Sequence, residues 1–280
     1  MKKIALFLVT MVVTLSLIGC GQQNQMADHQ TSSYNQMHRI EHNELQKNTI
    51  IHQELTDLLP TLKEWVKESL VEADYLDWEQ FENVCEVREF KSPELAGDLS
   101  DVVACYPYGT RMIVVCPEFF DSKSGGQRTY NLMHELVHSL VGVGKHGKEE
   151  ATHLFVEGIT DYLTYLVLAN TGLDYSLIYL NELNCIAWLA TLYGSDSITE
   201  MLCTGSILDF VDEKAGEKGA GAKLHNALAT IDKSQNREEV KEAILTEIDI
   251  LRAVSGSNVE VREKLTEAFY ASYAPYLESP

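Results

Sequence analysis

Two neighbouring stretches, TYNLMHELVHSLV at residues 129–141 and EATHLFVEGITDYLTYLVLA at residues 150–169, decide how this chain is expected to fold. Both are rich in large apolar residues and contain no proline, so each predicts a long and largely buried helix. The three glycines in segment 142–147 predict the end of the first helix, and Asn170-Thr171-Gly172 predicts the end of the second. We therefore expect two buried helices with a short loop between them.

The first stretch contains two histidines four residues apart, His134 and His138, with Glu135 directly after the first. Residues i and i+4 lie one above the other on a helix, so the two imidazoles can occupy two corners of a tetrahedral metal site. Glu135 is rotated by about 100° around the helix axis and can reach a metal-bound water without being a ligand. Because buried imidazoles are costly without partners, this H-E-x-x-H pattern favours a metal over two core histidines that bond backbone carbonyls.

The second stretch offers two carboxylates on one helix face, Glu157 and Asp161. Glu157 follows His138 after eighteen intervening residues, and Asp161 lies one turn further on the same helix face. A metal-bound imidazole needs an acceptor for its other N–H group, and this role suits Asp161. The alternative is a solvated face of an amphipathic helix, but the apolar residues on both sides of Glu157 disfavour it.

The spacing H-E-x-x-H, then about eighteen to twenty residues, then E-x-x-x-D resembles the gluzincin group of metallopeptidases, the thermolysin-like enzymes. The resemblance implies one Zn²⁺ per chain, bound by His134, His138 and Glu157. It also implies that Glu135 is the general base of catalysis and that Asp161 is the carboxylate that orients a histidine ligand.

Gluzincins commonly use a downstream tyrosine or histidine to bind the oxyanion of the transition state. By this resemblance Tyr179 is the first candidate and Tyr175 the second, although both also suit aromatic packing. His225 is a weaker candidate for the same role. His153, between the metal-binding segments, is expected at the surface or in a loop.

The N-terminus has the pattern of an export signal. Lys2 and Lys3 precede an uncharged, mostly apolar run at residues 4–17, shorter than the ~20 residues that a membrane-spanning helix needs. The ending Leu-Ile-Gly-Cys20 resembles the lipobox of bacterial lipoproteins, which implies removal of residues 1–19 and lipid attachment at Cys20. An ordinary cleaved signal and an uncleaved anchor are the alternatives, and both also place the folded part outside the cytoplasm.

The rest of the chain is expected to contain one folded domain. Residues 20–36 are polar and predict a flexible tether, whereas residues 37–280 predict a zincin-like metallopeptidase domain of the α+β class. In it, a small antiparallel or mixed sheet precedes the H-E-x-x-H helix, and the C-terminal part is mostly α-helical. The N-terminal helices and sheet are expected at about 37–127, the active-site helices at about 128–172, and the helical C-terminal part at about 173–280. The gluzincin resemblance covers roughly residues 100–195.

Shorter elements are expected before the two central helices. Helical spacing extends over about residues 37–59 and resumes at 62–70, with Pro60 as the break. The gluzincin resemblance implies that the run at 111–116 is the edge strand of a small sheet and aligns a peptide substrate by β-addition. Three β-type runs lie at 84–90, 101–106 and 111–116, with a hairpin turn at 107–110 and a loop at 122–127.

The C-terminal part predicts a series of helices by its apolar spacing. These are expected at 176–193, 197–203, 222–231, 238–254 and 259–273, with a loop at 216–221.

Composition narrows the class of partners. The 280 residues include 22 Lys and Arg against 42 Asp and Glu, a net charge of −20, and 45% of them are hydrophobic. This is the composition of a globular protein, and the negative charge disfavours nucleic acid as a partner.

Five cysteines remain besides Cys20. They show no C-x-x-C spacing, so most are expected as small buried residues, while one or two disulfides stay open: Cys85, Cys105, Cys116, Cys185 and Cys203.

Two functional hypotheses follow. The first is an extracytoplasmic zinc metallopeptidase that is held to the cell membrane by its lipid anchor alone and acts on a peptide or protein substrate. The second keeps the same fold without catalysis: an envelope lipoprotein that binds a peptide or protein partner and has a structural zinc site. An intact Glu135 favours the first, because a structural site has no use for that residue.

Overall fold

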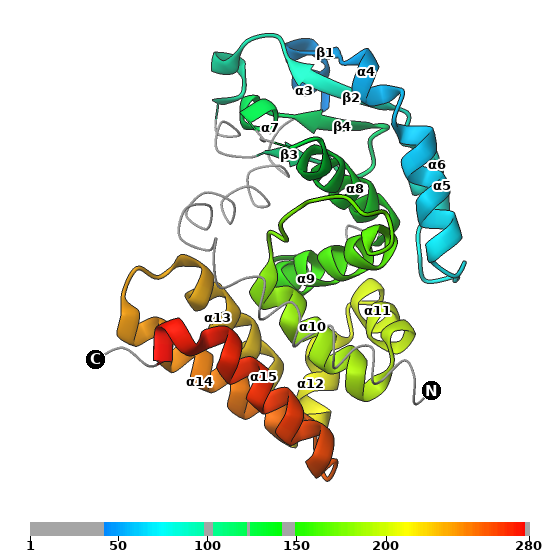
Figure 1. The fold of residues 1–280 in the computed structure, drawn as a ribbon. Helices are drawn as coiled ribbons and strands as arrows, with labels where there is room; N and C mark the ends of the chain where they lie inside the picture. Colours follow the sequence, from blue (N-terminus) through cyan, green and yellow to red (C-terminus); the bar gives the residue numbers. More distant parts are fainter. Residues whose placement is uncertain (1–41, 98–102, 122–123, 142–148, 278–280) are drawn as a thin grey trace. The chain divides into compact units, whose positions relative to one another are not determined.

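The computed structural model describes residues 42–97, 103–121, 124–141 and 149–277 and confirms the α+β class (Figure 1). The expected export signal, Cys20 and the tether lie outside the described residues. The chain divides into two compact units. Among the described residues, a sheet unit contains those from 42 to 141 and from 160 to 178, and a helical unit contains those from 149 to 159 and from 179 to 277.

The sheet unit is built on a four-stranded mixed sheet with the strand order β1-β2-β4-β3. Strands β2 and β4 are parallel, with Glu86 opposite Met112, whereas β1 and β3 run antiparallel to their neighbours. The three expected strands are confirmed in shortened form, but β1 was not expected. The strands are β1 (Thr49–Ile51), β2 (Glu86–Phe90), β3 (Ala104–Cys105) and β4 (Met112–Val115).

The expectation that residues 111–116 form an edge strand is wrong. Strand β4 lies between β2 and β3, so its backbone is paired on both sides within the sheet. The outer positions in the strand order belong to β1 and β3. The hairpin turn between β3 and β4 is confirmed, because Thr110 N donates to Pro107 O at 3.1 Å and Gly109 has a φ of 75°.

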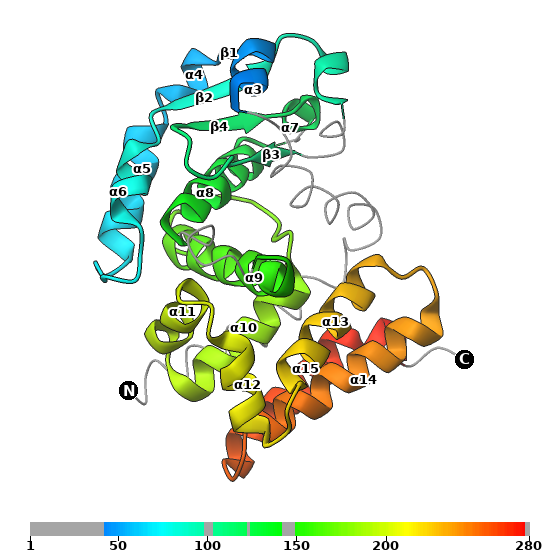
Figure 2. The same ribbon diagram turned by 180° about the vertical axis from the view of Figure 1, so that it is seen from behind.

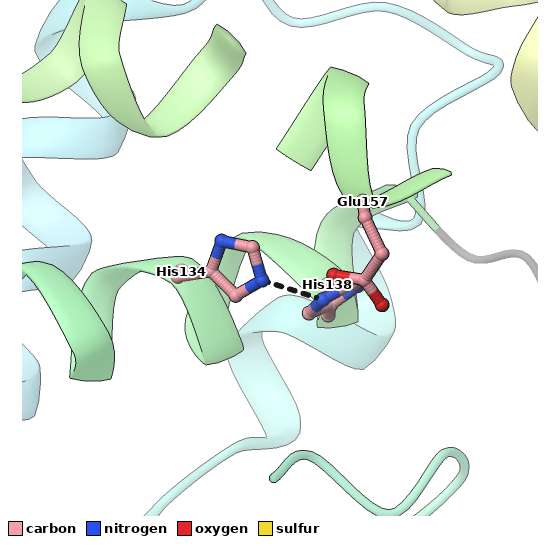
Figure 3. A group of neighbouring side chains, drawn as sticks. All are labelled: His134, His138 and Glu157. Atoms are coloured by element: carbon pink, nitrogen blue, oxygen red, sulfur yellow. Dashed lines mark hydrogen bonds between the residues drawn. The ribbon is translucent and has the colours of Figure 1, made fainter. Parts of the chain in front are cut away.

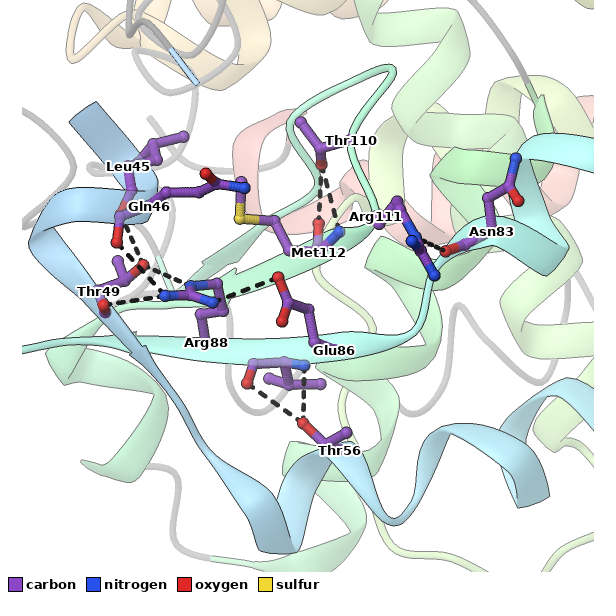
Figure 4. Close-up of polar contacts among 11 residues, drawn as sticks. Leu45, Gln46, Thr49, Thr56, Asn83, Glu86, Arg88, Thr110, Arg111 and Met112 are labelled. Carbon is purple, nitrogen blue, oxygen red and sulfur yellow. Dashed lines mark hydrogen bonds and ion pairs between the residues drawn. The ribbon is translucent and has the colours of Figure 1, made fainter. Parts of the chain in front are cut away.

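The side chain of Arg88 binds the first residue of strand β1 (Figure 4). Its guanidinium donates to Thr49 Oγ1 at 2.8 Å and to Thr49 O at 3.1 Å, and it forms an ion pair with Glu86 at 3.3 Å. Charge-assisted hydrogen bonds of this kind are stronger than neutral ones. Arg88 is 39 residues from Thr49 in sequence, so local helical spacing could not reveal the strand.

Short helices surround the sheet. Pro60 does not break a helix as expected but lies in the first turn of α5, where a missing N–H group costs no intrahelical hydrogen bond. The continuous helical region expected over 37–59 is also wrong, since a strand divides its described part. The helices are α3 (His42–Asn48), α4 (Gln53–Thr56), α5 (Leu59–Ser69), α6 (Trp78–Asn83) and α7 (Pro117–Asp121), with a 3₁₀ turn at Pro93–Leu95.

Two long helices confirm the central expectation. Helix α8 (Gly125–Val141) packs on β3 and β4, and helix α9 (Glu149–Leu168) follows it in the chain. Helix α8 begins four residues earlier than expected, so residues 125–127 are helical and do not belong to a loop. At Gly126 a Cβ atom would lie 2.2 Å from the carbonyl oxygen of Asp174, so this first turn packs directly against that backbone. The glycine-rich segment 142–147 lies outside the described residues.

The C-terminal part is helical, as expected. Helix α10 begins at Leu180 and not at Ser176, and helix α12 was not expected. Helices α13, α14 and α15 lie side by side (Figure 2). Among the described helices, none is both long and apolar enough to cross a membrane. The helices are α10 (Leu180–Tyr193), α11 (Ser195–Cys203), α12 (Ile207–Ala215), α13 (Ala220–Lys233), α14 (Arg237–Val254) and α15 (Val259–Leu277).

The core of the helical unit contains a buried carboxyl group. Glu247 on α14 is fully buried, and its Oε2 atom accepts a hydrogen bond from the Tyr273 hydroxyl at 2.8 Å. Burial raises the pKa of Glu247 to about 8, although the bond from Tyr273 opposes this rise. Glu182 and Cys185 on α10 lie near the same group, and burial together with the two carboxylates raises the pKa of the Cys185 thiol.

We predict that Glu247 makes the protein less stable as the pH rises. Its pKa is higher in the folded state than its ordinary value of 4.5, so the folded state holds a proton that the unfolded state releases. The stabilisation is complete below about pH 4.5 and is lost as the pH rises through about 8. Urea unfolding at pH 5, 7 and 9 should show a fall in the free energy of unfolding that exceeds about 1.4 kcal/mol. The variant Glu247→Gln should lack this component, and parallel pH curves for the two proteins would contradict the prediction.

Candidate metal centre

Helix α8 brings the two histidines together as expected. The Nε2 atoms of His134 and His138 face each other at 3.0 Å (Figure 3). Their ring planes are nearly perpendicular, with centroids 4.6 Å apart, and the His134 side chain is buried. The i, i+4 spacing in the sequence produces this arrangement directly, because both residues lie on one face of α8.

The other nitrogen of each ring is engaged by helix α9. His134 Nδ1 lies 2.7 Å from Asp161 Oδ1, and His138 Nδ1 lies 3.3 Å from Thr160 Oγ1. If each Nδ1 donates its proton to the oxygen, each Nε2 keeps a lone pair that points toward the other ring. Asp161 therefore lies within hydrogen-bond distance of a histidine, as expected, and its role in orienting a metal ligand stays a prediction. The sequence analysis did not identify Thr160 as a partner of His138, because no motif marks a threonine at this position.

Glu157 completes a group of three possible metal ligands. One ligand atom from each of His134, His138 and Glu157 can be chosen so that all lie within 4.8 Å of one another. Figure 3 shows the Glu157 carboxylate beside the His138 ring. Glu157 is buried, and Asp161, one turn further along α9, is fully buried. The solvated helix face considered as an alternative is therefore wrong for both carboxylates.

The donor set fits a zinc ion. Two nitrogens bound to one zinc at about 2.0–2.1 Å in tetrahedral geometry lie about 3.3–3.4 Å apart, close to the 3.0 Å between these Nε2 atoms. Two imidazole lone pairs that face each other repel unless a proton or a cation lies between them. The buried carboxylate of Glu157 supplies a negative charge at the same point. Residues His134, His138 and Glu157 could thus hold a metal ion.

A close helix crossing lies beside Glu157. At Gly158 a Cβ atom would lie 2.6 Å from Glu182 O and 2.9 Å from Ile186 Cγ1, so only glycine allows α9 to pack this closely on α10. The crossing therefore restrains the turn of α9 that bears Glu157. The sequence contains this glycine, but its partner on α10 is known only from the structure.

Glu135 lies next to the sheet. It is 9% exposed, and its charge contributes to the raised pKa of two buried thiols, Cys105 on β3 and Cys116 after β4, for which burial is the main cause. The carboxylate therefore lies near the β3–β4 hairpin, on the side of α8 that packs on the sheet. Its expected role as a general base stays a prediction.

The two tyrosines expected as oxyanion donors differ in position. Tyr175 stacks on Tyr130 of α8 with ring centroids 5.2 Å apart, and burial raises its pKa to about 12, with Tyr165 and Asp161 adding to the rise. Tyr175 thus fits the aromatic packing considered as an alternative. Tyr179 directly precedes α10, and its carbonyl oxygen accepts a hydrogen bond from Leu183 N. The donor role of Tyr179 stays a prediction.

The expectation for His153 is wrong, because it is buried and not at the surface. Its ring contacts that of His225 on α13, with centroids 4.9 Å apart. Burial and the neighbouring His153 lower the pKa of His225 to about 4, so this imidazole is neutral at pH 7.

Helix α13 also bears Asp232. Burial raises the pKa of Asp232 to about 6, and the charge of Glu157 adds to this rise.

The five described cysteines are free thiols. Cys85 is exposed and the others are buried, in agreement with the expectation that most of them are small buried residues: Cys105, Cys116, Cys185 and Cys203. No disulfide joins any pair of cysteines within the described residues.

Comparison with known proteins does not identify this chain. No protein-family model, no curated protein and no solved structure matches it. The interpretation of the site therefore depends on the geometry of its own residues.

We predict that the chain binds about one zinc ion, and that the double variant His134→Ala/His138→Ala does not. These residues supply two of the three ligand atoms that lie together. Elemental analysis of the gel-filtered full chain would measure the metal content. A matched control is His153→Ala/His225→Ala, which removes two buried histidines that supply none of the three ligand atoms and should leave the zinc content unchanged. Stoichiometric zinc in the His134/His138 variant would disprove this ligand assignment.

Proposed function

We propose that this chain is a zinc-dependent metallopeptidase that acts outside the cytoplasm. The observation that carries the proposal is the pairing of His134 and His138, whose Nε2 atoms face each other while α9 holds both Nδ1 atoms. Glu157 adds a buried carboxylate to this pair, and Glu135 lies one residue from His134. A structural metal site needs the ligands but has no use for Glu135.

The chain's own residues have separate roles in the proposed reaction. When bound, a zinc ion polarises a substrate carbonyl and lowers the pKa of a coordinated water. Glu135 accepts a proton from the attacking water and delivers it to the leaving amine, as a general base and then a general acid. Asp161 and Thr160 hold the two imidazoles in the tautomer that presents Nε2. Tyr179 is the candidate donor to the oxyanion.

The substrate is proposed to be a peptide or protein segment in an extended conformation. Strand β3 lies at one end of the strand order, beside β4. Its residue Cys105 lies near Glu135. A peptide that adds to β3 as a further strand would have its backbone close to the general base. This proposal replaces the earlier expectation for residues 111–116, which form an interior strand.

The proposed location follows from the N-terminus of the sequence. Lys2 and Lys3, the apolar run and Cys20 have the order of a lipoprotein signal, and the polar residues after Cys20 suit a tether. We propose that the mature chain begins at Cys20 and is attached to the membrane by lipid alone. The net charge of −20 argues against nucleic acid as a partner.

Replacement of the general base tests catalysis separately from metal binding. The variant Glu135→Gln should reduce peptide hydrolysis by about 10²–10⁴-fold, because it removes proton transfer, while the zinc content stays at the wild-type value. Digestion of an unbiased peptide library, followed by mass spectrometry, would detect cleavage without knowledge of the specificity. If the wild-type protein binds zinc but cleaves nothing, the non-catalytic lipoprotein with a structural zinc site becomes the better interpretation.

Replacement of Cys20 tests the anchor. Wild-type protein produced in a bacterial host should partition into the detergent phase of Triton X-114, and Cys20→Ala should move it to the aqueous phase, because the thiol that accepts the lipid is gone. The variant Cys85→Ala removes an exposed cysteine of the folded part and serves as the control. If Cys20→Ala stays in the detergent phase, the chain is anchored by something other than a lipid at Cys20; wild-type protein in the aqueous phase would contradict the anchor itself.

A further inference from the structure

A buried tyrosine on α8 contacts the carboxylate that holds His134. Tyr130 is fully buried and lies one helical turn before His134. Its hydroxyl donates a hydrogen bond to Asp161 Oδ1, the same atom that lies 2.7 Å from His134 Nδ1. The phenol oxygen also accepts a hydrogen bond from the backbone N–H group of Ile178 at 3.2 Å.

The count of protons gives each of these bonds a direction. The Ile178 amide can only donate, so the phenol oxygen is its acceptor, and the single phenol proton is left for Asp161. Asp161 Oδ1 then accepts from both Tyr130 and His134 Nδ1. A carboxylate that accepts two such bonds has its orientation fixed, and the imidazole that donates to it has its tautomer fixed.

The backbone segment 174–178, which supplies the Ile178 amide, is held on the first turns of α8. The Gln127 amide binds both backbone groups of Ser176: its Nε2 donates to Ser176 O at 3.2 Å, and its Oε1 accepts from Ser176 N at 2.8 Å. Ser124 Oγ donates to Asp174 O at 3.2 Å. These bonds hold the segment whose Ile178 amide donates to the Tyr130 hydroxyl.

We propose that Tyr130 is a positioning residue of the metal centre. It holds Asp161, and through Asp161 it holds His134 in the orientation that presents Nε2 to a metal ion. The segment 174–178 thereby contributes to metal affinity although it supplies no ligand. This proposal rests on the proposed metal site, because Tyr130 acts on the ligand His134 and not on a substrate.

The competing explanation is that Tyr130 only fills the core. A core residue affects the free energy of unfolding, whereas a positioning residue also affects the affinity and the geometry of the bound metal. The chain offers a matched control in Tyr273, a buried tyrosine whose hydroxyl donates to the buried carboxyl group of Glu247 in the helical unit. Both Tyr→Phe substitutions remove one hydroxyl that is bonded to a buried carboxyl group.

The experiment measures zinc affinity of the purified full chain by competition with a chromophoric chelator. The variant Tyr130→Phe should bind zinc about 10-fold more weakly. This is the lower end of the loss in metal affinity that is typical when a residue that orients a metal ligand is replaced. The absorption bands of the Co²⁺-substituted protein should also change in this variant. The variant Tyr273→Phe should lower the urea midpoint while its zinc affinity and Co²⁺ spectrum remain those of the wild type.

A double-mutant cycle tests whether Tyr130 acts through Asp161. Asp161→Ala should weaken zinc binding by about 10–100-fold, and addition of Tyr130→Phe to it should cause little further loss. Additive losses would overturn the proposed route, and wild-type affinity in Tyr130→Phe would overturn the role itself. Absence of zinc binding by the wild-type protein would instead disprove the metal site, and this proposal with it.

Discussion

The hydrogen bond between Asp161 and His134 is the constraint on which the candidate site depends. A fully buried carboxylate is costly unless donors surround it, and here the imidazole of His134 and the hydroxyl of Tyr130 both point at Oδ1. The same bond turns the His134 ring so that Nε2 faces His138. One contact therefore both stabilises the buried carboxylate of Asp161 and turns Nε2 of His134 toward His138.

Helix α9 combines three functions within a little more than one turn. Glu157 offers a ligand atom, Thr160 and Asp161 hold the two imidazoles, and Gly158 lets the same turn pack on α10. Because a helix converts residue numbers into positions, Glu157 and Asp161, four residues apart, lie on one face of α9. This explains why the E-G-I-T-D segment is polar in a helix that is otherwise largely apolar.

The chemistry proposed for the site needs the sheet as well as the two helices. Helix α8 presents the histidines toward α9, while Glu135, on another side of α8, lies near Cys105 of β3. In the proposed reaction, a general base near the terminal strand β3 would be suited to act on an extended peptide. The 100° between successive helical residues places Glu135 on a different side of α8 from His134.

The sequence by itself determined the parts of this protein that depend on local spacing. It predicted α8 and α9, the facing pair His134 and His138, and Glu157 and Asp161 on one helix face, because a helix converts residue numbers directly into positions. Only the tertiary structure decided strand β1, the interior place of the strand at 111–116, and the partners Thr160 and Tyr130. Strand pairing and hydrogen bonds to a ligand join residues that are far apart in the chain, such as the 39 positions between Arg88 and Thr49, and no local period reports such contacts.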